Sequence, residues 1–204
     1  MNILVLGGFL GSGKTTFLMK LARYLTEKST HSGPTKLAII ENEIGSVGID
    51  SNILGSAGLQ TRDLFAGCAC CSLREELVST VREIQAELDP QTIIIESTGV
   101  GIPENIRKLI QENMDVPVSV VVLVDGSRWF RILPAVGTLA RGQLVGCDMV
   151  LINKADLLSE EKKAEAMEAM KAETACEKIY LCSSVSPELE DTVLPDIASM
   201  LNGD

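Results

Sequence analysis

The chain has 204 residues, with 18 Lys and Arg against 28 Asp and Glu, so its formal net charge is -10. Hydrophobic residues make up 46 % of the sequence, which is enough apolar material for a core and excludes wholesale disorder. The acid excess disfavours nucleic acids and anionic membranes as partners, because no basic stripe is present to neutralise phosphates. The length fits one domain over residues 1–204.

The first residues enter a strand pattern at once and lack a basic region, so we do not expect them to form a signal peptide. Strands are predicted in chain order at 2–6, 36–41, 92–96, 118–125, 148–153 and 178–182. Helices are predicted near 14–28, 72–88, 103–113, 128–145, 159–174 and 188–201, and residues 44–62 are expected to form a surface loop. No apolar run reaches the roughly 20 residues that cross a membrane. The alternation predicts an α/β fold with a mainly parallel sheet and helices on both faces, whose ligands bind at the carboxyl ends of strands.

Residues 8–15, the phosphate loop, read GFLGSGKT and fit the pattern G-x-x-x-x-G-K-[ST] between a strand and a helix. Glycines allow backbone N–H groups to surround phosphate oxygens, Lys14 can reach the β- and γ-phosphates, and the Thr15 hydroxyl can bind Mg²⁺. The alternative, a glycine-rich turn that fits by chance, is disfavoured by the strand before it and the helix after it. The residues expected to bind nucleotide here are Gly8, Gly11, Ser12, Gly13, Lys14, Thr15 and Thr16.

The strand at 92–96 ends in an acid, and the 96–99 segment that follows reads ESTG. Glu96 would hold Mg²⁺ directly or through water, and the Gly99 N–H could contact the γ-phosphate. The alternative is an acid that merely ends a strand. The phosphate loop favours the magnesium interpretation, with Lys14 and Glu96 as catalytic residues.

The 153–156 segment reads NKAD and directly follows a strand. A carboxylate at Asp156 can accept both the N1–H and the N2–H₂ of guanine, whereas adenine lacks this donor pair. Lys154 would cover the base, Asn153 would brace the pocket, and Ser183 is a weaker candidate for a further base contact. The alternative is a helix start with Asp156 as an acid of the first turn.

Three of the six cysteines, Cys68, Cys70 and Cys71, lie within the four positions of the cysteine segment, 68–71. Thiolates select ions such as zinc or copper(I), and three ligands leave an incomplete shell that suits a metal to be handed on. A redox-sensing cluster and inert cysteines at a helix start remain as alternatives. Cysteines without a secretion signal indicate reduced thiols and a cytoplasmic location.

The loop that begins at Glu41 and reaches Asp50 is acidic and leaves a strand near the expected γ-phosphate position. Its acids could bind Mg²⁺, position water or reach the transferred metal, so Glu41 is also a catalytic candidate and Asp50 a metal ligand. A loop that orders on the γ-phosphate and relaxes after hydrolysis is a switch. The alternative is a solvated acidic loop.

Taken together, these segments resemble the CobW-type GTPases, relatives of the urease and hydrogenase accessory GTPases (CobW/HypB/UreG). The resemblance is carried by GGFLGSGKTT, ENEIGSVGID, GCACCSLR, IIIESTG, VVLVDG and INKADL, at residues 7–16, 41–50, 67–74, 93–99, 121–126 and 152–157.

The resemblance implies a P-loop fold, slow GTP hydrolysis to GDP, and delivery of zinc, cobalt or nickel to a client metalloprotein or a metal-cofactor pathway such as cobalamin synthesis. It also leads us to expect a nucleotide-dependent homodimer. Two departures are Ser46, where relatives commonly carry Glu, and the lack of a C-terminal domain and a His-rich stretch. Client recognition would then need a separate protein, or the sequence is a part of a longer chain.

Two other functions use some of these features. A small-molecule kinase would share the phosphate loop but needs neither the 153–156 segment nor the cysteines, and it predicts equal binding of ATP and GTP. A non-catalytic metal or redox sensor predicts a metal affinity that is independent of nucleotide. Arg74 and Arg128 are the arginines that could stabilise charge during hydrolysis.

Overall fold

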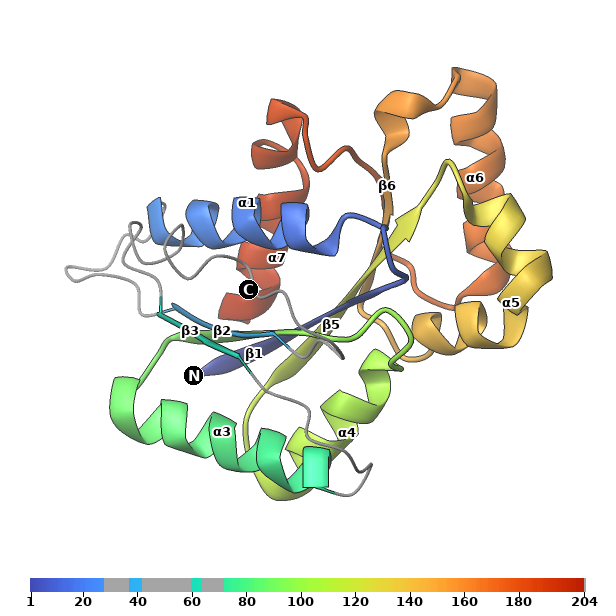
Figure 1. Ribbon diagram of the computed structural model, residues 1–204. Coiled ribbons are helices and arrows are strands. Elements are labelled where there is room, and N and C mark those ends of the chain that lie inside the picture. The colour runs from blue at the N-terminus through green and yellow to red at the C-terminus, as the bar shows by residue number, and fades with distance from the viewer. Residues whose placement is uncertain (28–36, 42–59, 64–71, 204) are drawn as a thin grey trace.

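The computed structural model describes residues 1–27, 37–41, 60–63 and 72–203. These residues form a seven-stranded sheet in the order β3-β2-β4-β1-β5-β6-β7, in which each adjacent pair is parallel (Figure 1). The predicted α/β fold with a mainly parallel sheet is confirmed. The strands are β1 (Asn2–Gly8), β2 (Leu37–Glu41), β3 (Gln60–Asp63), β4 (Thr92–Glu96), β5 (Val118–Asp125), β6 (Met149–Asn153) and β7 (Ile179–Leu181).

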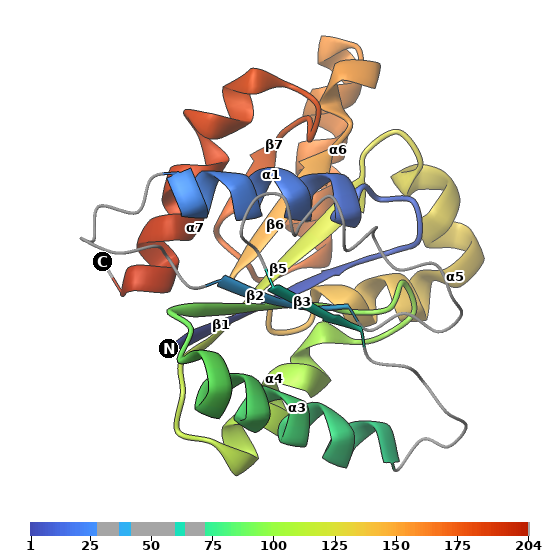
Figure 2. The same cartoon turned by 60° about the vertical axis from the view of Figure 1, so that its left-hand side comes forward.

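Helices cover both faces of the sheet (Figures 1 and 2). α1 and α7 pack on one face, and buried residues of α3, α4, α5 and α6 form the core on the other. None of the helices in the described parts of the chain is long and apolar enough to cross a membrane. The helices are α1 (Lys14–Glu27), α3 (Ser72–Leu88), α4 (Pro103–Asn113), α5 (Trp129–Leu144), α6 (Glu160–Glu173) and α7 (Val193–Asn202), with short 3₁₀ turns η1 (Ala155–Leu157) and η2 (Pro187–Glu190).

The strands in the middle of the sheet are apolar at nearly every position because both of their faces are covered. In β1, Ile3 and Val5 belong to the core under α3 to α6, whereas Leu4 and Leu6 belong to the core under α1 and α7. All four side chains have no exposed surface. This alternation explains why the hydrophobic runs in the sequence predicted strands.

Two predicted segments differ from the structure, and the predicted helix at 128–145 is found as α5 with a break inside it. Residues 60–62 were expected in a loop, but they belong to β3, a polar edge strand that pairs with β2. The predicted helix at 188–201 is divided into η2 and α7, because Pro195 lacks an N–H and fits the first turn of an α-helix without breaking it. α5 is interrupted at Val136, whose φ and ψ are -139° and 39°, two residues after Pro134.

Candidate nucleotide-binding site

The phosphate loop connects β1 to α1, and three of its glycines take backbone angles that other residues rarely adopt. Gly8, Gly11 and Gly13 have φ values of +138°, +77° and +95°. A Cβ at Gly13 would collide with the side-chain amide of Asn153, so glycine is needed there both for its φ and for space. The loop then leads directly into the first turn of α1, whose N-terminus attracts anions.

Lys14 lies at the start of α1 and is only 8 % exposed. Its Nζ donates a hydrogen bond to the Gly8 carbonyl at 3.0 Å and lies 4.0 Å from Oε1 of Glu96. The ammonium is therefore held at the loop by oxygens of the protein, and phosphate oxygens are acceptors of the same kind. This position suits the predicted contact to the β- and γ-phosphates.

The Thr15 hydroxyl donates a 3.4 Å hydrogen bond to Oε1 of Glu96, so a hydroxyl and a carboxylate lie side by side below the loop. Hard oxygen ligands of this kind are the ones that Mg²⁺ prefers, and the pair therefore fits a magnesium ion. β2 and β4 are in register with Glu41 opposite Glu96, which brings the Cα of Glu41 to the same edge of the sheet. Thr16 follows in the first turn of α1 and is exposed.

The 153–156 segment is tied to the phosphate loop by two side chains. Asn153 donates through Nδ2 to the Ser12 carbonyl at 2.7 Å and accepts a bond from the Ser184 N–H at 2.8 Å. Lys154 has a φ of +63°, and its Nζ donates to the Gly11 carbonyl at 2.7 Å. The segment thus meets the phosphate loop directly, and Asp156 lies exposed in η1 beside it.

Asp125 completes this arrangement and was not among the predicted site residues. It is 2 % exposed at the end of β5, and its Oδ2 accepts a 2.7 Å bond from Nζ of Lys154. Its Oδ1 accepts bonds from the N–H and the hydroxyl of Ser127 at 3.0 and 2.6 Å. The signal that could have found it is the one that found Glu96: an acid at the carboxyl end of an apolar strand.

Buried hydroxyls gather around the same loop. Ser12, Ser183 and Ser184 are at most 8 % exposed, and within the described residues their Oγ atoms have no hydrogen-bond partner. Buried polar groups without partners are rare and costly in folded proteins. Their concentration here fits a site that binds a polar ligand, and it includes the predicted residue Ser183.

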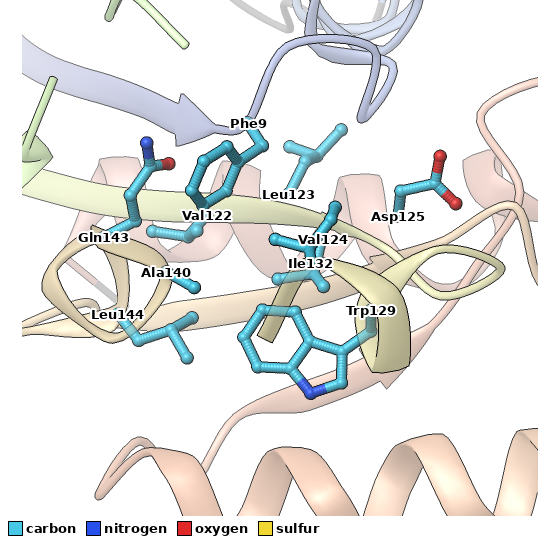
Figure 3. A pocket seen from close by; sticks show the side chains of 10 residues that line it. All are labelled: Phe9, Val122, Leu123, Val124, Asp125, Trp129, Ile132, Ala140, Gln143 and Leu144. Carbon is cyan, nitrogen blue, oxygen red and sulfur yellow. The ribbon is translucent and has the colours of Figure 1, made fainter. Parts of the chain in front are cut away.

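The segment after β4 lies against the phosphate loop. A Cβ at Gly99 would come within 2.7 Å of the Leu10 nitrogen, so only glycine allows this approach. The Gly99 carbonyl accepts a 2.9 Å bond from Nε2 of Gln143 on α5. Gln143, whose side chain Figure 3 shows, was not predicted as a site residue and carries no sequence signal. The position of a Cβ at Gly11 lies 3.3 Å from Nη1 of Arg128, so this arginine lies beside the loop.

Several predicted residues lie outside the described part of the chain. These are Asp50, the three cysteines Cys68, Cys70 and Cys71, and the side chains of Glu41 and Arg74. Among the described residues, no group of three or more His, Cys, Asp or Glu side chains could hold a metal ion.

The other three cysteines, Cys147, Cys176 and Cys182, lie in the described part of the chain. Cys182 is buried in the core, and burial raises the pKa of its thiol to about 12. Burial and the neighbouring Cys176 raise the pKa of Cys147 to about 12 as well. Cys147 and Cys176 line a cavity of about 370 Å³ beside the ion pair between Arg141 and Glu173. The raised pKa values make the thiols of Cys147 and Cys182 poor metal ligands at neutral pH.

A family profile described as CobW/HypB/UreG, nucleotide-binding domain, matches residues 2–181. The chain belongs to this family. The match covers β1 to β7 and includes the phosphate loop, the 96–99 segment and the 153–156 segment, so the predicted resemblance is confirmed.

Curated CobW/HypB/UreG relatives include two bacterial proteins described as zinc chaperones. YjiA of Escherichia coli is 32 % identical over 174 residues, which cover 79 % of this chain and 51 % of YjiA. CobW of Pseudomonas aeruginosa is 29 % identical over 217 residues, which cover 86 % of this chain and 53 % of CobW. The chain thus spans about half the length of these relatives.

Solved structures share the fold. HypB from Helicobacter pylori, crystallised in complex with nickel, aligns with a TM-score of 0.67 at 20 % identity, over 100 % of this chain and 88 % of HypB. Zn(II)-bound YjiA from E. coli aligns with a TM-score of 0.58 at 22 % identity, over 89 % of this chain and 56 % of YjiA. At these identities the likeness shows a common fold.

Proposed function

We propose that the chain is a GTP-binding domain that hydrolyses GTP slowly and uses this cycle to deliver a divalent transition metal to a client metalloprotein or a metal-cofactor pathway. The observation that carries the proposal is the direct bonding of the 153–156 segment to the phosphate loop through Asn153 and Lys154. It brings a base-binding sequence and a phosphate-binding sequence into one site, in a member of the CobW/HypB/UreG family.

Guanine is the proposed base. Asp156 is exposed beside the loop, so its carboxylate is free of the core and can accept two N–H groups from the edge of a guanine. The aliphatic stem of Lys154 would cover the ring while its ammonium stays bonded to Asp125 and Gly11. Adenine offers no matching pair of donors, so a kinase that prefers ATP is the disfavoured alternative.

Hydrolysis would rest on charge stabilisation and positioning. Lys14 would contact the β- and γ-phosphates, and Thr15 and Glu96 would hold Mg²⁺, which when bound neutralises charge on the phosphate oxygens. Glu41, whose Cα lies opposite that of Glu96, is a candidate for orienting water. Arg128 lies beside Gly11 and is the described arginine placed to approach a phosphate.

The metal is the transported substrate, and Cys68, Cys70 and Cys71 are its proposed ligands. Relatives described as zinc chaperones and structures solved with zinc or nickel support a divalent transition metal. Thiolates remain available only in a reducing compartment, so the proposal places the protein in the cytoplasm. A homodimer formed in the presence of nucleotide is part of the proposal.

Nucleotide preference is tested by titrating the protein with GTP, GDP and ATP. Tight binding of both guanine nucleotides and weak binding of ATP are expected, and equal affinity for ATP and GTP would overturn the guanine assignment. An Asp156→Asn variant should bind GTP weakly and xanthosine triphosphate tightly. Guanine carries an amino group at C2, which needs an acceptor from the protein, whereas xanthine carries a carbonyl there, which needs the donor that the asparagine amide supplies. Asp191→Asn, at an exposed acid after η2, is the matched control.

Metal delivery is tested by titrating zinc, cobalt and nickel into the nucleotide-free protein, the GDP complex and the complex with a non-hydrolysable GTP analogue. An affinity that changes with nucleotide is expected, and an identical affinity in all three states would favour a sensor. A Cys70→Ser variant should weaken binding, whereas Cys182→Ser should not, because Cys182 is a buried core thiol. Unchanged binding by Cys70→Ser would refute the thiolate site.

A further inference from the structure

Gln143 is an unusual residue for its position. It lies in the last turn of α5, is 2 % exposed, and lines a small apolar pocket together with Phe9, Val122 and Leu144 (Figure 3). Its Nε2 donates a 2.9 Å hydrogen bond to the carbonyl of Gly99, which lies 44 residues earlier in the chain. Its Oε1 is buried and has no hydrogen-bond partner among the residues that the structure describes.

Packing does not explain this amide. A leucine or methionine would fill the same apolar space without leaving a buried oxygen unpaired, and an unpaired buried oxygen destabilises the fold. The single polar contact of the side chain is the bond to Gly99 within the described structure. The bond to the Gly99 carbonyl is therefore the interaction that a glutamine, and not an apolar residue, provides at position 143.

Gly99 is the point where the 96–99 segment meets the phosphate loop. The position of a Cβ at Gly99 lies 2.7 Å from the nitrogen and 3.1 Å from the Cα of Leu10, so the two backbones are in close contact. The segment turns immediately afterwards, because the Gly101 N–H bonds to the Thr98 carbonyl at 3.0 Å. A bond from α5 to the Gly99 carbonyl therefore adds a second contact that fixes the segment where it meets the loop.

We propose that Gln143 is a positioning residue that holds the Gly99 backbone against the phosphate loop, so that the Gly99 N–H is preset to receive a γ-phosphate. This inference rests on the proposed function, because it concerns how the same site distinguishes GTP from GDP. Without the amide the segment must be ordered when GTP binds, and that ordering weakens GTP binding. GDP has no γ-phosphate, so its affinity does not depend on the bond.

The test uses Gln143→Met, which keeps the length of the side chain and removes the donor. Dissociation constants are measured for GDP and for a non-hydrolysable GTP analogue by calorimetry, with the whole chain and Mg²⁺. The affinity ratio of analogue to GDP should fall about fivefold, the effect of one net hydrogen bond. Leu144→Ala is the matched control, because it perturbs the same pocket but keeps the Gln143 amide that bonds to Gly99, and it should leave the ratio unchanged.

Amide hydrogen exchange of residues 97–101 gives a second readout that needs no nucleotide. Exchange should be faster in Gln143→Met than in the wild type and unaffected in Leu144→Ala. Gln143→Leu provides a second variant should the first be poorly folded, as judged by circular dichroism. The role of Gln143 would be overturned if exchange is unchanged and the affinity ratio of analogue to GDP in Gln143→Met either stays within twofold of the wild-type ratio or rises. If the wild type bound no guanine nucleotide, the proposed function would fail instead, while the exchange result would still report on the bond.

Discussion

Replacing Asp125 with asparagine removes the anchor of Lys154 with little change in shape. The asparagine can keep one acceptor for Ser127, but it places an amide N–H₂ or a neutral oxygen where Nζ of Lys154 now meets Oδ2 at 2.7 Å. A hydrogen bond to a charged group contributes about 1.5–3 kcal/mol. Lys154 is 32 % exposed and solvent screens part of the interaction, so the lower half of that range applies. We expect a loss of about 1.5–2 kcal/mol.

This loss predicts a fall of about 3–8 °C in the melting temperature, at roughly 2–4 °C per kcal/mol for a chain of this size. Because Lys154 would cover the base, GDP affinity should fall by about 10- to 30-fold if the same 1.5–2 kcal/mol is lost from binding, since 1.4 kcal/mol corresponds to a factor of ten. Thermal unfolding followed by the fluorescence of Trp129, the sole tryptophan, and GDP titration measure the two effects.

Asp148→Asn is the control for Asp125→Asn. Asp148 lies just before β6, at the other end of that strand from Asn153, where it accepts bonds from Arg107 at 3.1 and 3.2 Å and from the Val120 N–H at 2.7 Å. It should lower stability and leave GDP affinity unchanged. The reasoning is refuted if Asp125→Asn binds GDP within twofold of the wild type, or if Asp148→Asn weakens GDP binding equally.

Three further predictions follow from single contacts. Gly13→Ala should abolish GDP binding in titrations, because its φ is +95° and the new methyl group would collide with the Asn153 amide. Cys147 and Cys182 should react slowly with iodoacetamide at pH 8, because their pKa values are raised to about 12 and only the thiolate reacts. Their reaction rates, measured by peptide mass spectrometry, should rise about tenfold for each pH unit above 8. Ser159→Ala should cost about 1 kcal/mol in denaturant unfolding, because the serine hydroxyl caps α6; an unchanged midpoint would contradict it.

The sequence predicted the interior of the sheet well and its margins poorly. β1, β4 and β5 are covered on both faces, so an apolar run was sufficient to identify them. β3 reads QTRD and forms through backbone pairing with β2, which no local pattern of hydrophobicity reveals. The division between η2 and α7 depends on where Pro195 falls within a turn, which periodicity alone did not resolve.

For the candidate site, motifs at strand ends indicated which segments to compare but not the bonds between them. The sequence predicts that Asn153 and Lys154 lie beside a base, and the structure shows that both are bonded to carbonyls of the phosphate loop. Asp125 was detectable as a strand-end acid, but Gln143 was not, because one polar residue on an apolar helix face has no pattern. Such long-range partners become visible only when the chain is folded.

The bonds from Asn153 and Lys154 to the phosphate loop also join distant parts of the sheet. Asn153 ends β6, and its bond to the Ser12 carbonyl links that strand to the loop after β1, two strands away in the sheet. The same side chain accepts the bond from the Ser184 N–H, which follows β7. A displacement of the phosphate loop would therefore also shift the ends of β6 and β7.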